Sequence, residues 1–482
     1  MLVIPRVLRA AALAAACGTA LLAAAGHATG EPAGKARPAA KEEPPKNQTV
    51  TLAVDKTKLA NGLEVIFHVD RRAPVISVNI WYHVGSREDP QGRSGFAHLF
   101  EHLMFQGSKH VPEDTYNRYL QGAGGTGINA STWFDRTNYF ETVPKNRLEM
   151  ALWLESDRMA YLLSHVDEKT FASQREVVKN EYRQRYENAP YGMTLMYISA
   201  ALYPESHPYH RMGIGSPKEL DAASLDNVRE FFRTWYLPNN ASLVLAGDID
   251  VVKAHGLVEK YFSPIPSGPQ PTRATAQPLN PTKEVRLDIA AGVELPRITL
   301  AYPTPPRFAP GDAEINVIAQ LLTDGKSSRL QKKVVQEQKL ALNVQAGSGI
   351  MSRPLGTMFM ITITPNPSKP VDDVIRAIDA EVAALASGPI TEAELARVKT
   401  GIAADFTFKL DSTSARSDLI NEYNQDAGDP MFLARDMARH DRVSPDSIKE
   451  VVTQYLIPTR RVAAIVTPVK GAPVAGQLRG TK

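Results

Sequence analysis

The chain has 482 residues, of which 43% are hydrophobic and 22% charged, so it is long enough for two or three domains with ordinary cores. Its formal net charge is only +3, and both signs are interspersed, which argues against a nucleic-acid or anionic-membrane partner. The only cysteine, Cys17, lies in the N-terminal leader; without it the mature chain has no disulfide and no thiolate metal ligand.

Residues 1–28 have the pattern of an export signal. Two arginines precede an apolar run over residues 10–25, and small residues follow, with cleavage expected after Ala28 or after Ala25. A lipoprotein signal that anchors the chain through Cys17 is the alternative, but the apolar run ahead of this cysteine is short. We therefore expect a soluble periplasmic protein, since no later stretch is long and apolar enough to span a bilayer.

A tether and a group of strands come next. Residues 29–48 are rich in Pro, Ala, Lys and Glu, which predicts a disordered segment. Strands are predicted at Thr49–Val54, at Glu64–Val69 after an Asn-Gly turn, and at Val75–Val84.

The segment Gly95–Gly107 predicts a short apolar helix with Gly107 as its stop. It contains His98-Leu-Phe-Glu-His102, an H-x-x-E-H motif. Two histidines at i and i+4 leave one face of a helix one turn apart, so both rings can bind one zinc ion. Glu101 then lies beside the metal, where it can take a proton from water and pass it to a leaving amine. A pair of histidines without a metal, on an amphipathic helix, is the alternative interpretation.

A third ligand is expected because catalytic zinc sites usually have three protein ligands. The helix predicted at Glu168–Glu187 offers Glu176 and Glu181. Glu181 shares a stripe with Phe171, Gln174, Val177 and Val178, whereas Glu176 lies among polar residues. The sequence therefore favours Glu181, although an ion pair with Arg185 at i+4 would also explain an inward carboxylate.

The remaining pattern indicates two halves of the same kind, an α+β fold of two duplicated units with mostly antiparallel sheets. Predicted helices include Asn146–Leu163, Ser224–Trp235 and Val251–Phe262 in the first half, and Asp312–Leu322, Val371–Ala386, Glu392–Lys409 and Pro445–Tyr455 in the second. We predict a catalytic domain over 49–264, a Pro-rich linker over 265–282, an inactive second domain over 283–470 and a flexible tail over 471–482.

These motifs resemble the pitrilysin/insulinase family of zinc metallopeptidases, in its short-chain branch that includes the mitochondrial processing peptidase. The likeness covers residues 50–470 and includes the H-x-x-E-H motif, Asn129-Ala-Ser-Thr132, Thr137-Asn-Tyr139 and Arg175-Glu-Val-Val-Lys-Asn-Glu181. It implies the processing-peptidase type of metallohydrolase fold. It also implies one zinc ion per chain, held by His98, His102 and Glu181, with Glu101 as the general base.

The resemblance also implies a substrate site and a departure from the family pattern. In relatives the strand that starts at Ile128 pairs with the peptide backbone, so Asn129, Ala130 and Thr132 would bind substrate. A turn-adjacent Asn after a Gly-rich loop is the alternative for Asn129. Gln174 stands where longer-chain members tend to have a glutamate that supports a zinc ligand.

The function expected is that of an exported zinc metalloendopeptidase acting on unfolded peptides or small proteins. Family members enclose a chamber with four such units, so a second chain is implied, as a heterodimer or, as second choice, a homodimer. Two rivals remain: a non-catalytic assembly or chaperone-like subunit, and a peptide-binding module with a structural zinc site. A structural site needs a fourth protein ligand, and His110 is close in sequence but lies beyond Gly107.

Overall fold

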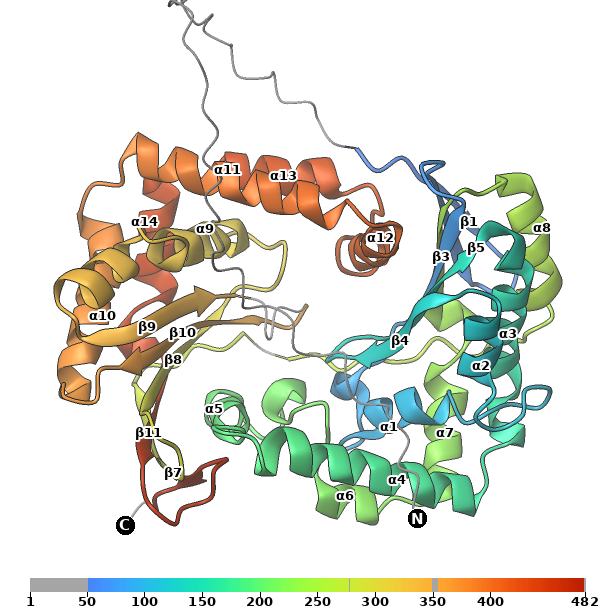
Figure 1. Cartoon of the computed structure of the whole chain (residues 1–482), viewed down its shortest axis with the longest axis horizontal. Helices are drawn as coiled ribbons and strands as arrows, with labels where there is room; N and C mark the ends of the chain where they lie inside the picture. Colours follow the sequence, from blue (N-terminus) through green and yellow to red (C-terminus); the bar gives the residue numbers. More distant parts are fainter. Residues whose placement is uncertain (1–50, 277, 349–353, 481–482) are drawn as a thin grey trace, which may run out of the picture. The chain divides into compact units, whose positions relative to one another are not determined.

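The computed structural model describes residues 51–276, 278–348 and 354–480 (Figure 1). The predicted export signal over 1–28, with Cys17, and the predicted tether over 29–48 lie outside the described residues. Thr49–Lys482 forms one compact unit. Among the residues placed in the structure, no helix combines the length and apolar character needed to cross a membrane.

The first half of the chain is built on a six-stranded sheet. Its order is β1-β2-β6-β3-β5-β4, in which only β2 and β6 run parallel. The predicted hairpin is confirmed, with Gly62 at a φ of 91° in the turn. The strands of this sheet are β1 (Asp55–Lys58), β2 (Glu64–Val69), β3 (Val75–Tyr82), β4 (Thr126–Thr132), β5 (Thr137–Pro144) and β6 (Ala241–Gly247).

One strand prediction is wrong. Residues 51–54 have no regular structure, and the first strand begins at Asp55 rather than within Thr49–Val54. Leu52 is instead buried in the core cluster of the second half. Leu52, with the partly buried Val54, anchors this segment by apolar packing without a ladder of backbone hydrogen bonds.

The second half repeats the first sheet. Its order is β12-β7-β11-β8-β10-β9, with β7 and β11 parallel in the positions of β2 and β6. The strands are β7 (Val285–Ala291), β8 (Arg297–Thr304), β9 (Ala341–Gly347), β10 (Thr357–Pro365), β11 (Val462–Pro468) and β12 (Gln477–Leu478). Five strands thus match one for one, and the predicted duplication of an α+β unit is confirmed.

Helices cover one face of each sheet. The predicted helices over Asn146–Leu163, Glu168–Glu187 and Ser224–Trp235 are found within a few residues, and a π-helical turn at Arg183–Glu187 completes the second of them. The helices are α1 (Phe96–Leu103), α2 (Tyr116–Gly122), α3 (Leu148–Tyr161), α4 (Glu168–Tyr182), α5 (Thr194–Leu202), α6 (Pro217–Asp221), α7 (Leu225–Trp235) and α8 (Val251–Phe262), then α9 (Asp312–Thr323), α10 (Val371–Ser387), α11 (Glu392–Lys409), α12 (Thr413–Ala427), α13 (Leu433–Asp441) and α14 (Pro445–Tyr455).

The other face of each sheet is covered by a helix from the opposite half. α12 packs on β3 and β6, and α5 packs on β7 and β11. The α5 contact is apolar, with Ile198 and Leu202 in one core cluster with Ile289 and Val462. The two halves therefore bury surface against each other, and neither sheet leaves its second face to solvent on its own.

The contact of α12 is largely polar. Asn421 is fully buried, accepts a hydrogen bond from Ser242 Oγ at 2.7 Å and donates one to the backbone oxygen of Asn79 at 3.0 Å. Ser417 Oγ bonds to Ser77 Oγ at 2.9 Å. The sequence analysis missed α5, α6, α12 and α13. In α12 the buried residues mix polar side chains such as Ser417 and Asn421 with Leu419, Ile420 and Tyr423, so no clean apolar stripe marks the helix.

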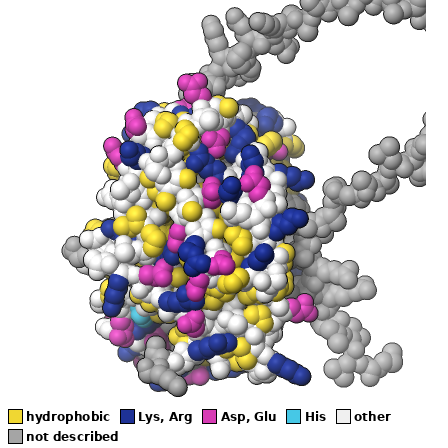
Figure 2. Space-filling model, turned by 90° about the vertical axis from the view of Figure 1, so that its left-hand side faces the viewer, with side chains coloured by type: hydrophobic (Ala, Val, Ile, Leu, Met, Phe, Trp, Pro, Cys, Tyr) yellow, Lys and Arg dark blue, Asp and Glu magenta, His cyan; other side chains and the backbone are white. Residues whose placement is uncertain are grey.

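On the face in view in Figure 2, acidic and basic side chains are interspersed, and no large patch carries charge of a single sign. This arrangement matches the small net charge of the chain.

For the domain boundaries we propose the division predicted from the sequence, 49–264 and 283–470 joined by residues 265–282.

Candidate metal centre

The motif helix α1 is fixed at its start by close backbone packing. Gly95 has a φ of 92°, and a Cβ at this position would lie 2.9 Å from the Cα of Gly215. Asp89 caps the helix, because its carboxylate accepts from the backbone N–H of Gly95 at 2.6 Å and of Ala97 at 3.0 Å. The helix ends at Leu103, four residues before the predicted stop at Gly107.

α1 and α4 bring the three predicted ligands together. His98, His102 and Glu181 each offer one ligand atom, and these atoms all lie within 4.8 Å of one another. Glu181 Oε2 is 3.2 Å from His102 Nε2 and 3.7 Å from His98 Nε2. Among the described residues they are the only such group of His, Cys, Asp and Glu side chains.

The ligand set fits a zinc ion in its chemistry. Burial lowers the pKa of His98 to about 4, so its ring is neutral near pH 7, as a metal ligand must be. Burial alone would raise the pKa of Glu181, but hydrogen bonding to His102 and the charge of Arg185 outweigh it, and the net pKa is lowered. Two imidazoles and a carboxylate would leave a fourth position open.

Glu181 also forms the ion pair with Arg185 that was given as the alternative explanation of its inward carboxylate. Its Oε1 lies 2.9 Å from Arg185 Nη1, while its Oε2 faces the histidines. Phe171, Gln174 and Val178 are buried as the stripe predicts, but Val177 is 42% exposed, so its place in the stripe is wrong. Glu176 points outward and pairs with Lys179 at 2.8 Å.

Glu101 lies beside the ligands, one position before His102. Burial raises its pKa, which a hydrogen bond with Thr132 and the nearby His102 partly oppose. Thr132 Oγ1 also reaches the backbone oxygen of Ala97 at 3.4 Å. The sequence did not predict this link between the edge strand β4 and the motif helix.

Two further observations define what surrounds the ligands. His98 Nδ1 is buried without a hydrogen-bond partner among the described residues, at the site where zinc-binding rings usually have a supporting acceptor. His110 belongs to another cluster, since its Nδ1 lies 2.5 Å from Asp157 Oδ1.

The edge strand β4 leaves backbone groups unpaired. Trp133 N bonds to Arg136 O at 2.8 Å, and Ser131 and Asn129 lie opposite Asn138 and Phe140. Because hydrogen-bonded pairs alternate along an antiparallel ladder, the N–H and C=O groups of Ala130 and Thr132 point away from β5. Asn129 lies on the same strand with an exposed side chain, but its own backbone faces β5.

A duplicated α+β fold with an inverted His/Glu/His motif on a helix is typical of the inverzincin class of zinc peptidases. Comparison of the sequence with family profiles agrees. Residues 64–212 match Insulinase (Peptidase family M16), and residues 222–402 match the Peptidase M16 inactive domain. The chain belongs to the pitrilysin/insulinase family of peptidases, M16, as its resemblance implied.

Individual relatives support this assignment. The zinc protease PqqE of Helicobacter pylori is 31% identical over 383 residues, which cover 79% of this chain and 83% of that protein. An uncharacterized zinc protease of Mycobacterium bovis is 24% identical over 88% of this chain and 95% of its own length. The crystal structure of a protease from Helicobacter pylori has a TM-score of 0.79 at 27% identity, covering 86% of this chain and 100% of that chain.

Proposed function

We propose that this M16 peptidase is an exported zinc-dependent endopeptidase that hydrolyses peptide bonds of unfolded peptides or small proteins. The observation that carries the proposal is the convergence of His98, His102 and Glu181 within 4.8 Å, with Glu101 adjacent on the same helix. The relatives named zinc proteases support the choice of metal. When bound, zinc supplies Lewis-acid polarisation of a carbonyl and lowers the pKa of a coordinated water.

The residues of the chain would divide the remaining work. His98, His102 and Glu181 hold the metal, and Arg185 fixes the second oxygen of Glu181. Glu101 takes the proton of the attacking water and returns it to the leaving amine. Burial raises the pKa of the Glu101 carboxyl, which makes its carboxylate a stronger base, and a hydrogen bond with Thr132 orients it.

The substrate would bind as an added strand on β4. The outward backbone groups of Ala130 and Thr132 can pair with an extended peptide, which places its chain beside Glu101 through Thr132. We assign Asn129 to the same site, with its exposed side chain available to a peptide group. Extended pairing requires a disordered segment, so folded proteins would be poor substrates.

Export and partner follow from separate observations. The leader over 1–28 predicts a periplasmic protein, with a lipid anchor on Cys17 as the alternative. A fold relative, PqqL of Escherichia coli, is described as a periplasmic protease. The chain covers 48% of the length of pitrilysin, with a TM-score of 0.74 at 19% identity, which supports a second chain of the same family as partner, in a heterodimer or a homodimer.

The inactive second domain is part of the same proposal. The inactive-domain profile matches residues 222–402, and all three ligands precede this range. The alternative function is a non-catalytic assembly or chaperone-like subunit, since a structural relative from Pseudomonas fluorescens is described by its inactive domain. That relative is 18% identical and shows the fold alone.

Hydrolysis of a mixed pool of unstructured peptides tests the proposal, with zinc content measured for the purified chain and for Glu101→Gln. We expect about one zinc per chain in both and cleavage only by the unaltered chain, slowed roughly 10²- to 10⁴-fold in the variant. Zinc in both with cleavage by neither, even after addition of the co-expressed partner, would favour the non-catalytic alternative. Absence of zinc from both would overturn the metal assignment.

A further inference from the structure

The helix that carries the third ligand continues past Glu181 into a turn that holds Arg185. Residues Arg183–Glu187 form a π-helical turn directly after α4. Turns of this kind occur inside helices mainly at functional sites. Gly192 packs against the turn, since a Cβ there would lie 2.1 Å from the backbone oxygen of Tyr186. The position of Arg185 is therefore set by backbone packing as well as by its own side-chain contact.

The Arg185 side chain reaches back to the third ligand and leaves most of its donors open. Its Nη1 lies 2.9 Å from Glu181 Oε1, while the other oxygen of that carboxylate faces the histidines. Within the described residues this is the one ion pair of Arg185. A guanidinium has five N–H donors in one plane, so a single contact leaves others for a ligand. The side chain is 69% exposed, so a ligand can reach it.

Arg185 also lines a cavity of about 90 Å³ beside the metal centre. Two further walls are His98 of α1 and Thr132 at the end of β4, the strand proposed to bind the substrate backbone. The rest of the lining is mainly apolar, and it includes no carboxylate in the described part of the chain. A peptide paired with β4 would run past the mouth of this cavity, where Arg185 supplies the positive charge.

A second arginine, Arg136, lies near the general base but is bound elsewhere. Its Nη1 donates to the backbone oxygen of Ser131 at 2.8 Å and to the hydroxyl of the same residue at 2.7 Å. Two carboxylates of α12, those of Asp418 and Glu422, also face its guanidinium. An anionic oxygen at the metal centre would have to compete with all of these groups for Arg136, whereas Arg185 has donors to spare.

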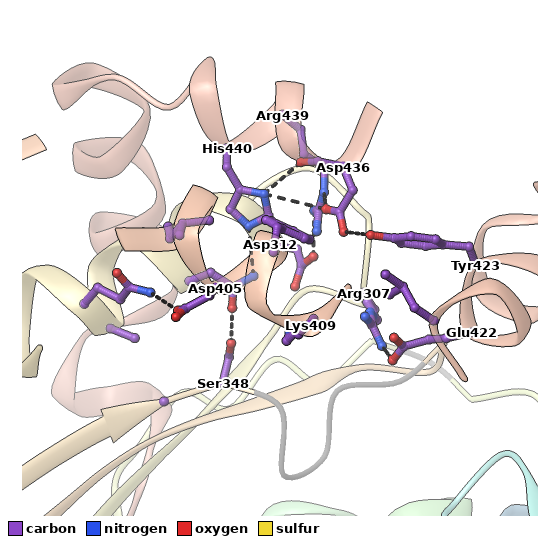
Figure 3. Close-up of a pocket in the computed structure, with 17 residues that line it drawn as sticks. Arg307, Asp312, Ser348, Asp405, Lys409, Glu422, Tyr423, Asp436, Arg439 and His440 are labelled. Atoms are coloured by element: carbon purple, nitrogen blue, oxygen red, sulfur yellow. Dashed lines mark hydrogen bonds and ion pairs between the residues drawn. The ribbon is translucent and has the colours of Figure 1, made fainter. Parts of the chain in front are cut away.

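The second half shows that the pairing with Glu181 is not a requirement of the helix. A polar cavity of about 370 Å³ lies there between α9, α11, α12 and α13 and at the end of β9, the edge strand that corresponds to β4 (Figure 3). Counted from the N-caps of α4 and α11, Asp405 and Lys409 take the places of the third ligand and of the arginine. In the part of the chain that the structure describes they form no ion pair, and Asp405 accepts from the Gln320 amide at 3.4 Å. The ion pair with Arg185 is therefore particular to the half with the metal-binding group.

We propose that Arg185 is a catalytic residue, which stabilises the carbonyl oxygen of the cleaved peptide bond while that oxygen carries negative charge. The inference rests on the proposed peptidase function and deepens it by adding a group that acts on the reacting atoms. When water adds to the carbonyl carbon, one water proton passes to Glu101, the π electrons of the C=O bond move onto oxygen, and Arg185 donates to this oxyanion.

The second step reverses the charge on the oxygen. The electron pair returns to re-form the C=O bond as the C–N bond breaks, and the leaving amine takes the proton from Glu101. The contact with Arg185 is thus strongest between the two steps. The apolar lining of the cavity strengthens this charged hydrogen bond, because it keeps water away from the donor and the oxyanion.

Steady-state kinetics of the full zinc-loaded chain test the inference, with an internally quenched peptide chosen from those cleaved in the mixed pool. We expect Arg185→Ala to lower kcat roughly 10²-fold and to leave KM within about twofold, because one donor to the oxyanion is lost. Arg185→Lys should recover part of kcat. Guanidinium chloride, added far below the concentration that unfolds the chain, should recover part of kcat in Arg185→Ala. Arg183→Ala, the other arginine of the same turn, is the matched control and should change nothing.

Zinc content and inhibitor binding separate this role from a purely structural one. A phosphinic peptide of the same sequence has an anionic tetrahedral group in place of the cleaved bond, and a ketomethylene peptide has a neutral group there. Arg185→Ala should retain about one zinc per chain and bind the phosphinic peptide roughly 10²-fold more weakly, with unchanged affinity for the ketomethylene peptide.

The outcomes distinguish this inference from the proposed function. An unchanged kcat in Arg185→Ala would overturn the inference while the peptidase stands. Loss of zinc from this variant, with hydrolysis restored by added zinc, would also overturn it and leave Arg185 as a support of Glu181. A chain without hydrolytic activity would remove the proposed function. Selective weakening of the phosphinic peptide would then still support Arg185 as the donor to an oxyanion, and equal weakening of both peptides would overturn it.

Discussion

The metal centre and the cavity of the second half occupy equivalent places in two copies of one fold. Three, six and seven residues after Gly95 come His98, Glu101 and His102. At the same distances from Gly311 lie Glu314, Val317 and Ile318, and the last two are fully buried. The second helix fills two of the three positions that the first uses for chemistry with apolar side chains, Val317 and Ile318.

This difference shows that the fold does not depend on the ligands. Both copies keep the left-handed glycine before the helix and the order of the sheet, although within the described ranges only the first copy has a metal-binding group. The chemistry is therefore set by a few side chains on a shared scaffold. Substitutions at these side chains should alter metal binding and activity with little effect on stability. Substitutions in the contact between the two halves should lower stability with little effect on metal binding.

The largest effect is expected at the third ligand. Glu181→Gln should reduce zinc content well below one per chain and slow peptide hydrolysis roughly 10³-fold, because the carboxylate charge that balances the metal is lost. Zinc analysis and initial rates measure both. Glu176→Gln, the exposed glutamate on the same helix, is the control, and equal loss in both variants would contradict the assignment of Glu181.

A large loss of stability is expected where the halves meet. Asn421→Ala removes two hydrogen bonds from a fully buried contact and leaves Ser242 and the Asn79 carbonyl unpaired. We expect the free energy of unfolding in urea to fall by about 3 kcal/mol. The exposed Gln338→Ala should change it by less than about 0.5 kcal/mol, and a similar change in both would argue against a specific contact.

Acid should weaken the same interface. Burial lowers the pKa of His83 to about 4, while its Nδ1 lies 2.5 Å from Gln425 Oε1 of α12. The unfolded chain, with a histidine pKa near 6.5, binds the proton more readily, so stability is lost as pH falls from about 6.5 toward 4. For His83, the expected fall in the free energy of unfolding is about 2 kcal/mol between pH 7 and pH 5.

Urea unfolding of metal-free protein at several pH values measures this loss of stability, because chelation removes the pH dependence of zinc binding itself. His83→Gln should show a shallower fall in stability between pH 7 and pH 5 than the unaltered chain. Parallel curves for the two proteins would assign the acid sensitivity to other buried histidines, such as His207, whose pKa is also lowered to about 4 by burial.

The smallest effect is expected at a helix cap shared by the two copies. Asp167 caps α4 by accepting from Thr170 N at 2.8 Å, and Thr391 caps α11 by accepting from Glu394 N at 3.2 Å. Either residue changed to Ala should cost about 1 kcal/mol in the free energy of unfolding. Only Asp167→Ala should also weaken zinc binding, because α4 carries Glu181. Equal zinc affinity in the two variants would contradict an influence of the α4 cap on the metal site.

The sequence by itself determined the parts that depend on local spacing. An i, i+4 pair of histidines lies on one face of any helix, and Glu181 could be chosen over Glu176 from the phase of one apolar stripe. The resemblance of these motifs to a known family implied that the three side chains share one zinc ion, and the structure brings their ligand atoms within 4.8 Å of one another. The end of α1 could not be located from the sequence. The helix stops at Leu103 because its packing stops there, and Gly107, at a φ of 111°, belongs to a later turn.

Tertiary structure decided the features in which one half completes the other. α12 buries Ser417 and Asn421 against a sheet more than 170 residues earlier in the chain, so its pattern looks like that of a solvated segment. The link of Thr132 to Glu101 likewise joins a strand and a helix that sequence spacing does not connect. Polar burial of this kind is invisible to periodicity, because its stabilisation comes from hydrogen bonds to partners that only the folded chain supplies.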